Sequence, residues 1–478
     1  MDGGLTEAVS AVLIAGELRE CADSHDVFDP WTADRVGSVG VATWEHCDEA
    51  CAAAQESMLH PIPIAERAAI ARRVADAIRE QKESLTDLLV REIGKPLAFA
   101  RGEVERCERT FRLASEAGDT MQIHNSDLSY DPRGQNFKGT WQRFPVGVVL
   151  GFVPYNWPIN LAAHKIAPAI LAGCPVIMKL SPLAPLSTLA LCQIVVESGA
   201  PKESISALHL SNELAQRLLL DSRVRMLSFT GSPAVGWMLK EIVPKKRVIL
   251  ELGGNAPAIV HEDADVEWAA KQIAVSGYGY AGQVCISAQN VFVHESVYER
   301  VRERLREETE QCPTGDPKDG GVVCGPLIDD MATAKVRGAI DAAVSTGGEI
   351  IAQAKVEGHA RLIPPTLIEP GSSDDDIVRE EVFGPVLTLQ RYSDIGSLAN
   401  WLNGGKYRLQ ASIFTQSPAV AQGAFESLDY GGVILNDAPT IRFDSMPYGG
   451  EGESGFGREG VKFAIEEMTA PRSYVRRI

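Results

Sequence analysis

Segments with strand character and segments with helix character alternate along the chain from residue 146 to residue 250. Strands are predicted at 146–153, 176–179, 206–210, 226–229 and 248–250, and helices between them at 162–172, 187–198, 213–220 and 234–243. Strands that are separated by single helices pair in parallel, with helices on both faces of the sheet. This region therefore predicts an α/β fold with a doubly wound parallel sheet, whose ligands bind at the carboxyl ends of the strands.

Further elements are expected on both sides of this sheet. Apolar residues recur at helical spacing over 66–92, and a second helix over 98–117 follows the break at Gly94-Lys95-Pro96. Other expected features are a strand-turn region at 27–42, a polar hairpin at 121–144, a second strand-helix alternation over 258–435 with strands at 291–294, 386–389 and 433–436, and a final strand at 474–478. At 478 residues the chain is too long for one core, so two or three domains are expected.

The charge and the cysteines restrict partners and compartment. A formal net charge of -18 argues against nucleic acid and acidic membranes as partners. No run approaches the roughly 18 apolar residues of a membrane helix, and Met1-Asp2-Gly3-Gly4 lacks the basic start of a secretory leader. The nine cysteines have neither disulfide nor zinc spacing, and Cys47 and Cys51 are interpreted as packing residues. The prediction is a cytoplasmic protein without a metal site.

Cys285 is the strongest candidate for a reactive group. Free cysteines are usually small buried hydrophobic residues, but this one comes shortly after Gly282 and before small residues, as on a tight turn that a substrate can reach. Glu251 lies 34 positions earlier, beside the Gly253-Gly254 pair. A thiol and a carboxylate in such settings suggest covalent catalysis, with the thiol as nucleophile and the carboxylate as the base that activates water.

Three further motifs are candidates for binding. In Pro154-Tyr155-Asn156-Trp157-Pro158 the Asn156 amide is a candidate donor to a developing oxyanion, and the alternative is a helix cap. Gly231 to Gly236 joins a strand to a helix, where free N–H groups bind phosphate, although a plain turn is the alternative. Lys179 ends a strand where ligands bind, and a surface lysine is the alternative.

Together these motifs resemble the NAD(P)-dependent aldehyde dehydrogenase superfamily, from about residue 27 to the C-terminus. The matching runs are GKP (94–96), PYNWP (154–158), FTGSPAVG (229–236), ELGGN (251–255), GQVC (282–285), EEVFGPV (380–386) and MPYGG with SGFGREG (446–460). The wording of 163–168 and 442–448 is most similar to a branch that includes lactaldehyde, phosphonoacetaldehyde and non-phosphorylating glyceraldehyde-3-phosphate dehydrogenases.

The resemblance implies a role for each motif. Cys285 is the expected nucleophile, Asn156 the oxyanion donor together with the Cys285 N–H, and Glu251 the activator of the water that hydrolyses the thioester. The expected cofactor-binding residues are Pro154, Tyr155, Lys179, Gly231, Ser232, Gly236, Glu381 and Phe383. For Glu381 and Phe383 the alternative is a loop that only fastens the fold.

Departures from the family pattern bear on cofactor and substrate. Pro182 stands where NAD-preferring members often carry glutamate, so NADP becomes acceptable beside NAD. Val284 stands where members that grip phosphate tend to carry arginine, which argues against a strongly anionic substrate. Trp157, Arg106 and Arg442 are candidate substrate contacts for a small polar or hydroxylated aldehyde, and ordinary surface pairing is the alternative for the two arginines.

The resemblance also implies an architecture. A Rossmann-like cofactor domain is expected over 1–122 and 145–251, a catalytic domain over 252–445, and an oligomerisation arm over 123–144 and 446–478 that makes a homodimer or homotetramer. Two alternatives to hydrolytic dehydrogenation are a CoA-acylating enzyme, which usually lacks the glutamate, and a non-catalytic relative. Arg408 and Glu451 depart from the usual residues and have no explanation at this level.

Overall fold

The computed structural model describes residues 10–356 and 358–478, so the first residues, where no leader is expected, lie outside the described part. An eight-stranded sheet runs in the order β2-β1-β9-β8-β7-β10-β11-β21. The predicted parallel strands form its centre, as β7 (Val148–Phe152), β8 (Val176–Lys179), β9 (Ile205–Leu208), β10 (Val224–Thr230) and β11 (Arg247–Glu251). The doubly wound α/β prediction is confirmed, with strand boundaries shifted by at most two residues and the helix predicted at 162–172 beginning at Pro158.

Both edges of this sheet come from distant parts of the chain that the sequence did not indicate. At one edge, β1 (Ala11–Ile14) pairs antiparallel with β9 and with β2 (Glu17–Glu20). At the other edge, β21 (Gly455–Phe456) pairs antiparallel with β11, so that Gly455 lies opposite Glu251. The C-terminal region therefore adds a strand beside the end of β11.

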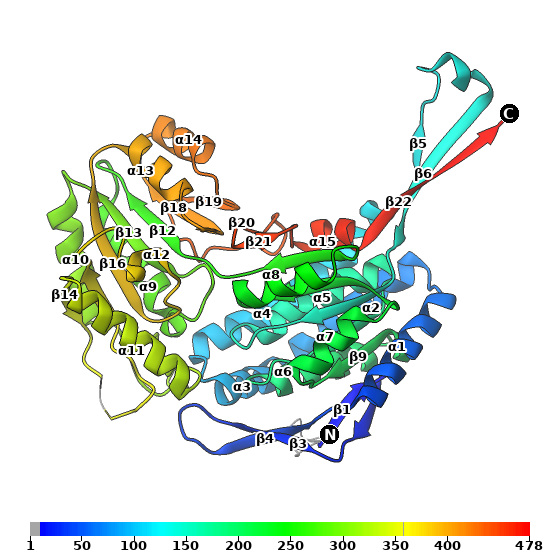
Figure 1. Ribbon diagram of the computed structural model, residues 1–478, viewed down its shortest axis with the longest axis horizontal. Helices are drawn as coiled ribbons and strands as arrows, with labels where there is room; N and C mark the ends of the chain where they lie inside the picture. Colours follow the sequence, from blue (N-terminus) through cyan, green and yellow to red (C-terminus); the bar gives the residue numbers. More distant parts are fainter. Residues whose placement is uncertain (1–9, 357) are drawn as a thin grey trace.

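Helices cover both faces of the sheet (Figure 1). Successive residues of each strand point to opposite faces, so every strand packs against both helical layers. Val149 and Met178 pack on one side, under α2 (Ile64–Glu80), α3 (Lys82–Ile93), α4 (Leu97–Glu116), α5 (Pro158–Ala172) and α6 (Pro185–Glu197). Leu150 and Ile177 pack on the other, under α1 (Trp44–Leu59), α7 (Asn212–Leu220) and α8 (Pro233–Ile242). Cys47 and Cys51 of α1 are buried in this second layer, which confirms that they are packing residues.

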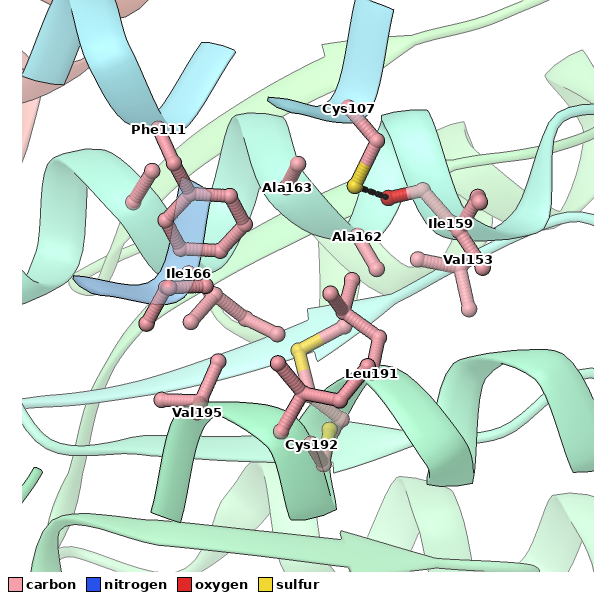
Figure 2. Packing of buried hydrophobic residues seen from close by; sticks show 14 of the residues in the cluster. Cys107, Phe111, Val153, Ile159, Ala162, Ala163, Ile166, Leu191, Cys192 and Val195 are labelled. Atoms are coloured by element: carbon pink, nitrogen blue, oxygen red, sulfur yellow. Dashed lines mark hydrogen bonds between the residues drawn. The ribbon is translucent and has the colours of Figure 1, made fainter. Parts of the chain in front are cut away.

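The contact between α4 and α5 is central to the first layer (Figure 2). Phe111 of α4 packs among Ala163 and Ile166 of α5, and the Cys107 thiol donates to the Ile159 carbonyl oxygen at 3.5 Å. The predicted single helix over 66–92 is wrong, because the chain leaves the helical conformation at Gln81 and divides into α2 and α3. The break at Gly94 is confirmed, with φ of 62° at that glycine.

A second sheet of seven strands lies in the order β14-β15-β16-β13-β12-β18-β19 (Figure 1). Its strands are β12 (Ala256–Val260), β13 (Ala288–His294), β14 (Glu349–Gln353), β15 (Thr366–Glu369), β16 (Val386–Tyr392), β18 (Gln410–Phe414) and β19 (Gly432–Leu435). Its helices are α9 (Val266–Tyr278), α10 (Tyr298–Glu310), α11 (Asp330–Ser345), α12 (Asp376–Arg379), α13 (Ile395–Asn403) and α14 (Pro418–Ser427). The second alternation in the sequence thus forms a separate α/β unit.

Three smaller sheets complete the fold. β3 (Ser24–Phe28) and β4 (Arg35–Gly40) form the predicted strand-turn region. β5 (His124–Ser126), β6 (Phe137–Pro145) and β22 (Thr469–Arg477), which follows α15 (Val461–Glu467), form a three-stranded arm that projects from the body (Figure 1). The final strand therefore pairs with the hairpin of its own chain. It begins five residues earlier than the predicted 474–478.

The third small sheet joins β17 (Tyr407–Arg408) to β20 (Glu451–Gly452) and gives Arg408 and Glu451 a structural explanation. The two residues face each other across this pair of strands. The Arg408 guanidinium donates to the carbonyl oxygens of Asn403, Gly405 and Asp429, and Glu451 pairs with Arg458. Both side chains fasten loops at the junction of the two α/β units.

Candidate functional site

A cavity of about 580 Å³ lies between the two α/β units. One wall follows the carboxyl ends of β8 and β10, where Ser181, Pro182, Gly231 and Ser232 line it. At its other end the cavity reaches Cys285 and residues from the opposite unit. Its size falls within the range of small-molecule and cofactor sites.

Cys285 follows a turn whose backbone is held in the left-handed region. Tyr280 and Ala281 have φ of 52° and 53°, and Gly282 has φ of 67°. A side chain at Gly282 would also overlap the Gly384 carbonyl oxygen, so only glycine fits. Non-glycine residues in this conformation cluster at functional sites because the surroundings must hold them there. The turn presents the thiol at the cavity wall, as predicted.

Burial raises the pKa of the Cys285 thiol to about 11, although the Tyr448 hydroxyl, 3.4 Å from Sγ, acts in the opposite direction. The thiol is therefore protonated at neutral pH in the protein without ligands. Tyr448 lies within the quoted 442–448 run, but no role was expected for it. Its proximity to Cys285 arises from tertiary structure, since the two residues are 163 positions apart.

The Asn156 side chain is fastened to the nucleophile turn. Its amide donates to the Gln283 carbonyl oxygen at 2.9 Å, and the Tyr155 hydroxyl donates to Gln283 Oε1 at 3.1 Å. The capping alternative for Asn156 is wrong, because α5 begins after Trp157. An amide nitrogen carries two hydrogens, so one N–H of Asn156 remains for another acceptor.

Glu251 ends β11 and lies 3% exposed at the cavity. Neither carboxylate oxygen has a hydrogen-bond partner within residues 10–356 and 358–478. Burial raises its pKa well above the usual value; the nearby Glu459 carboxylate adds to the shift, and Arg442 and Lys165 oppose it. Strongly shifted carboxyl groups of this kind are concentrated at functional sites.

A buried ion pair that sequence reasoning missed lies beside Glu251. Lys165 Nζ is 2.9 Å from Glu459 Oε1 and also donates to the Thr230 hydroxyl at 2.8 Å. Both side chains are at most 1% exposed, and the pair holds the pKa of Glu459 low, at about 2. A lysine within the apolar helix predicted over 162–172 was the available signal.

The two candidate arginines occupy different positions. Arg442 is buried, with its guanidinium 3.6 Å from the centre of the Tyr448 ring and 3.4 Å from Glu459. Arg442 Nε has no acceptor in the described part of the chain. Arg106 lies toward the outside and forms two hydrogen bonds to Asp444, at 2.6 and 3.2 Å, and Asp444 also contacts His164. Both line the cavity, so the surface alternative is wrong for Arg442.

Two more lining residues complete the inner end. Trp157 presents its ring to the cavity, and its Nε1 has no partner among the described residues. Val284 packs against the apolar group of Ile286, Leu409 and Tyr448. This end of the cavity thus has an apolar floor and two lining residues, Trp157 and Arg442, whose Nε1 and Nε atoms are buried without a partner among the described residues.

The predicted cofactor residues lie along the rest of the cavity, with two exceptions. Pro154, Tyr155, Gly231, Ser232, Glu381 and Phe383 line it. Gly236 does not, because it packs against Leu252, where a side chain would overlap the leucine. Lys179 is not among the lining residues either; it is buried at the end of β8, two residues before the lining residue Ser181, and burial lowers its pKa. The surface alternative for Lys179 is therefore wrong.

This wall has the features that a dinucleotide requires. Ser232 precedes α8 without bonding its first N–H groups through its side chain in the described chain, which leaves a helix N-terminus for a phosphate. Glu381 Oε1 accepts the Gly254 N–H at 2.9 Å, and burial raises the pKa of its carboxyl group to about 7. Phe383 has φ of 57° and lies edge-on to Tyr155. The residues present therefore fit NAD(P).

A parallel sheet with a free helix N-terminus at the cavity, a thiol at a strained turn and a buried carboxyl group together fit the class of dinucleotide-dependent oxidoreductases. The chain matches the aldehyde dehydrogenase family over residues 18–474 and belongs to it. It is an NAD(P)-dependent aldehyde dehydrogenase.

Known proteins are similar over nearly the whole chain. The 3-sulfolactaldehyde dehydrogenase of Priestia megaterium is 35% identical over 465 residues, which is 97% of each chain. Aldehyde dehydrogenase 21 of Physcomitrella patens, solved in complex with the reaction product succinate, is 35% identical with a TM-score of 0.94 and covers 99% of this chain and 98% of its own. The NADP-dependent glyceraldehyde-3-phosphate dehydrogenase of Bacillus halodurans, solved with NADP, is 30% identical with a TM-score of 0.93, over 98% and 99%.

Among residues 10–356 and 358–478, none of the helices combines the length and apolar character that spanning a bilayer requires.

Proposed function

We propose that Cys285 attacks the aldehyde carbon and forms a thiohemiacetal, and that Asn156 stabilises the oxyanion. The free N–H of the Asn156 amide and the Cys285 backbone N–H would donate to the oxygen on which negative charge develops. The hydrogen bonds from Tyr155 and Asn156 to Gln283 support this role, because they tie the donor to the turn that carries the thiol. A bound nicotinamide would supply the hydride acceptor for oxidation of the thiohemiacetal to a thioester on Cys285.

Glu251 is the proposed base for hydrolysis of the thioester. Its two buried oxygens have no partner in the described chain and are free to accept a proton from water, and burial raises the pKa of the group, which makes it a stronger base than an exposed glutamate. Lys165 and Glu459 form an ion pair near this carboxyl group. The glutamate raises the pKa of Glu251 and the lysine lowers it. Gly231, Ser232, Glu381, Phe383, Pro154 and Tyr155 would hold the cofactor, with Lys179 and Gly236 shaping the wall from behind.

The proposed substrate is a short aldehyde that carries a hydroxyl or an acid group. The observation that supports this most directly is that two residues lining the cavity, Trp157 and Arg442, each carry a buried N–H donor without a partner in the described chain. Buried donors are costly unless an acceptor meets them. Similar proteins support this class of substrate, since one relative is named for sulfolactaldehyde and one solved structure holds the product succinate. Val284 brings no positive charge to the cavity wall, which favours a hydroxyl group on the substrate over a doubly charged phosphate.

For the cofactor we propose NADP use, alone or together with NAD. Pro182 lines the cavity without a carboxylate that would repel a 2′-phosphate. The carbonyl oxygen of Pro182 is 2.9 Å from His25 Nε2, and His25 stacks on His209 with ring centres 4.8 Å apart. His25, His209 and Lys179 carry no negative charge, so none of them would repel a 2′-phosphate beside Pro182. NADP is bound in one of the similar structures.

The arm of β5, β6 and β22 is the proposed oligomerisation surface, in a homodimer or homotetramer. It projects from the body and exposes Tyr474 and Val475 at 65% and 56%. We also propose a cytoplasmic location, which suits nine cysteines that are all free.

Steady-state kinetics test the proposed reaction. Wild-type protein and C285S are compared with hydroxylated, acidic and aliphatic aldehydes, and NAD(P)H absorbance and acid release are both followed. The proposal expects free acid as product and loss of activity in C285S. Product that forms only when CoA is added supports the acylating alternative, and a silent panel with intact cofactor binding supports a non-catalytic relative.

A further inference from the structure

The pair Lys95 and Glu103 lies outside the cavity and has no part in the reaction described so far. Lys95 follows Gly94 at the turn before α4, and Glu103 lies two turns into α4. Both side chains are 0% exposed, and Lys95 Nζ bonds Glu103 Oε2. A fully buried ion pair is a poor way to stabilise a fold, because desolvation opposes the attraction between the charges. Its neighbours suggest a different task.

Glu103 holds the start of α5. Its second oxygen, Oε1, accepts the backbone N–H groups of Ile159 and Asn160 at 3.0 and 3.2 Å. In the described chain α5 has no cap from a side chain of its own, since Trp157 occupies that position. A carboxylate at a helix N-terminus satisfies free N–H groups and complements the helix dipole. α4 therefore supplies the cap of α5 from outside, next to the Cys107 contact with Ile159 (Figure 2).

Lys95 contacts both loops that meet at the reacting atoms. Its ammonium lies 3.9 Å from the centre of the Trp157 ring and 4.7 Å from that of Tyr280. Trp157 directly follows Asn156, and Tyr280 begins the strained turn that presents Cys285. A cation over two aromatic faces is attracted to both. One charged group thus holds the oxyanion loop and the nucleophile turn at a set separation.

We propose that Lys95 and Glu103 are positioning residues, which fix Asn156 relative to Cys285 through the start of α5 and the ring of Tyr280. The inference rests on the proposed role of Asn156 as oxyanion donor. Glu103 fixes the loop that carries Asn156, and Lys95 links that loop to the turn of Cys285. Donors must lie within hydrogen-bond distance of the developing oxyanion, so small displacements reduce the rate strongly.

A matched control exists in Glu92 on α3. This carboxyl group is also buried, at 1% exposure, and accepts N–H groups at the start of another helix, those of Leu186 and Ser187 in α6. Glu92 thus performs the same capping task for a helix that carries neither Asn156 nor Cys285. E92Q reports the general cost of disturbing a buried helix cap.

The test is a double-mutant cycle that measures kcat/KM for the aldehyde with saturating cofactor. K95M should lose about 10- to 100-fold, and N156A about 10²- to 10³-fold. In the N156A background K95M should cost nothing more, because the group that it positions is gone. K95M/E103Q removes both charges, keeps an oxygen for Ile159 and Asn160, and should show the same loss even where K95M alone folds poorly. E92Q should lower Tm and keep kcat/KM.

Two further readouts separate positioning from general weakening. Alkylation of Cys285 by iodoacetamide should keep its wild-type rate in K95M/E103Q, because Tyr448 and not Lys95 contacts the thiol. The inference is overturned if K95M costs the same factor with and without Asn156, or if E92Q loses as much kcat/KM as K95M/E103Q. If N156A itself keeps wild-type kcat/KM, the proposed role of Asn156 is overturned as well.

Discussion

The Sγ atom of Cys285 lies 3.4 Å from the hydroxyl oxygen of Tyr448, at the floor of a cavity between two α/β units. Burial raises the pKa of this thiol to about 11, and the tyrosine hydroxyl is the group that opposes the shift most. Burial therefore disfavours ionisation of this thiol, and Tyr448 is the neighbour that favours it most, ahead of Arg442.

Substitution of Tyr448 should slow the reactions of the Cys285 thiol. In Y448F the thiolate loses a hydrogen bond to a charged atom, which is worth about 1.5–3 kcal/mol. Alkylation of Cys285 by iodoacetamide should then be at least about tenfold slower at pH 8, while in the wild type the rate should keep rising with pH toward 11. Rates are measured by mass spectrometry without cofactor, with C285S as the control for other thiols. Equal rates in Y448F and wild type would contradict the prediction.

E251Q should separate the two halves of the reaction. One equivalent of NAD(P)H should form in a burst, and steady turnover should fall by at least about a hundredfold because the base is missing. A rapid-mixing absorbance trace measures both phases. Loss of the burst together with turnover would place Glu251 in acylation instead.

The same substitution should change the dependence of stability on pH. The pKa of Glu251 is raised in the folded protein, so its contribution to stability is present at low pH and is lost as pH rises through the folded value. E251Q removes a group that must ionise without a partner. Its Tm relative to wild type should therefore be higher at pH 8.5 than at pH 5, as measured by scanning calorimetry, and a constant difference would argue against the raised pKa.

W157F should reduce selectivity for polar aldehydes and keep the aromatic ring. Losing one donor should lower kcat/KM for hydroxylated or acidic aldehydes about tenfold and leave propanal unchanged. R442A should act in the same direction, but it also removes a charge beside Glu251, so W157F is the cleaner variant. If both variants affect polar and apolar aldehydes alike, neither donor binds the polar group of the substrate.

P182E should shift cofactor preference toward NAD. The new carboxylate would repel a 2′-phosphate, so kcat/KM with NADP should fall at least about tenfold, or about 1.4 kcal/mol, with little change for NAD. In the wild type the ratio of the two kcat/KM values is the direct measurement. A wild-type preference for NAD above about a hundredfold, near 2.7 kcal/mol, would refute NADP use.

V475D should dissociate the assembly, because it puts a charge on the exposed arm. Light scattering should then give the mass of one chain, whereas wild type gives a multiple. V344D is the matched control, since Val344 is an exposed apolar residue at 43% on α11, away from the arm. A wild-type protein with the mass of one chain would itself refute the assembly.

Local patterns in the sequence predicted the central sheet well because the strands β7 to β11 and their helices follow one another directly. The edge strands β1 and β21 were missed for a physical reason, since each is short and pairs with a distant strand. The break at Gln81 was missed because it involves neither glycine nor proline.

For the site, Cys285, Glu251 and Asn156 were predicted from their local settings, and all three line one cavity. Tyr448, Lys165 and Glu459 were not found as members of the site. Their importance depends on burial and on contacts between residues up to 294 positions apart, which no local pattern reveals. For Lys179 and Gly236 only the packed structure shows the surroundings, which bury Lys179 at the end of β8 and set Gly236 against Leu252.

The antiparallel pairing of Gly455 with Glu251 has a consequence for how the enzyme is made. Synthesis proceeds from the N-terminus, so Asn156, Glu251 and Cys285 have all left the ribosome before the strand that lines Glu251 exists. A chain that ends early would carry the proposed nucleophile without a finished wall around its proposed water activator.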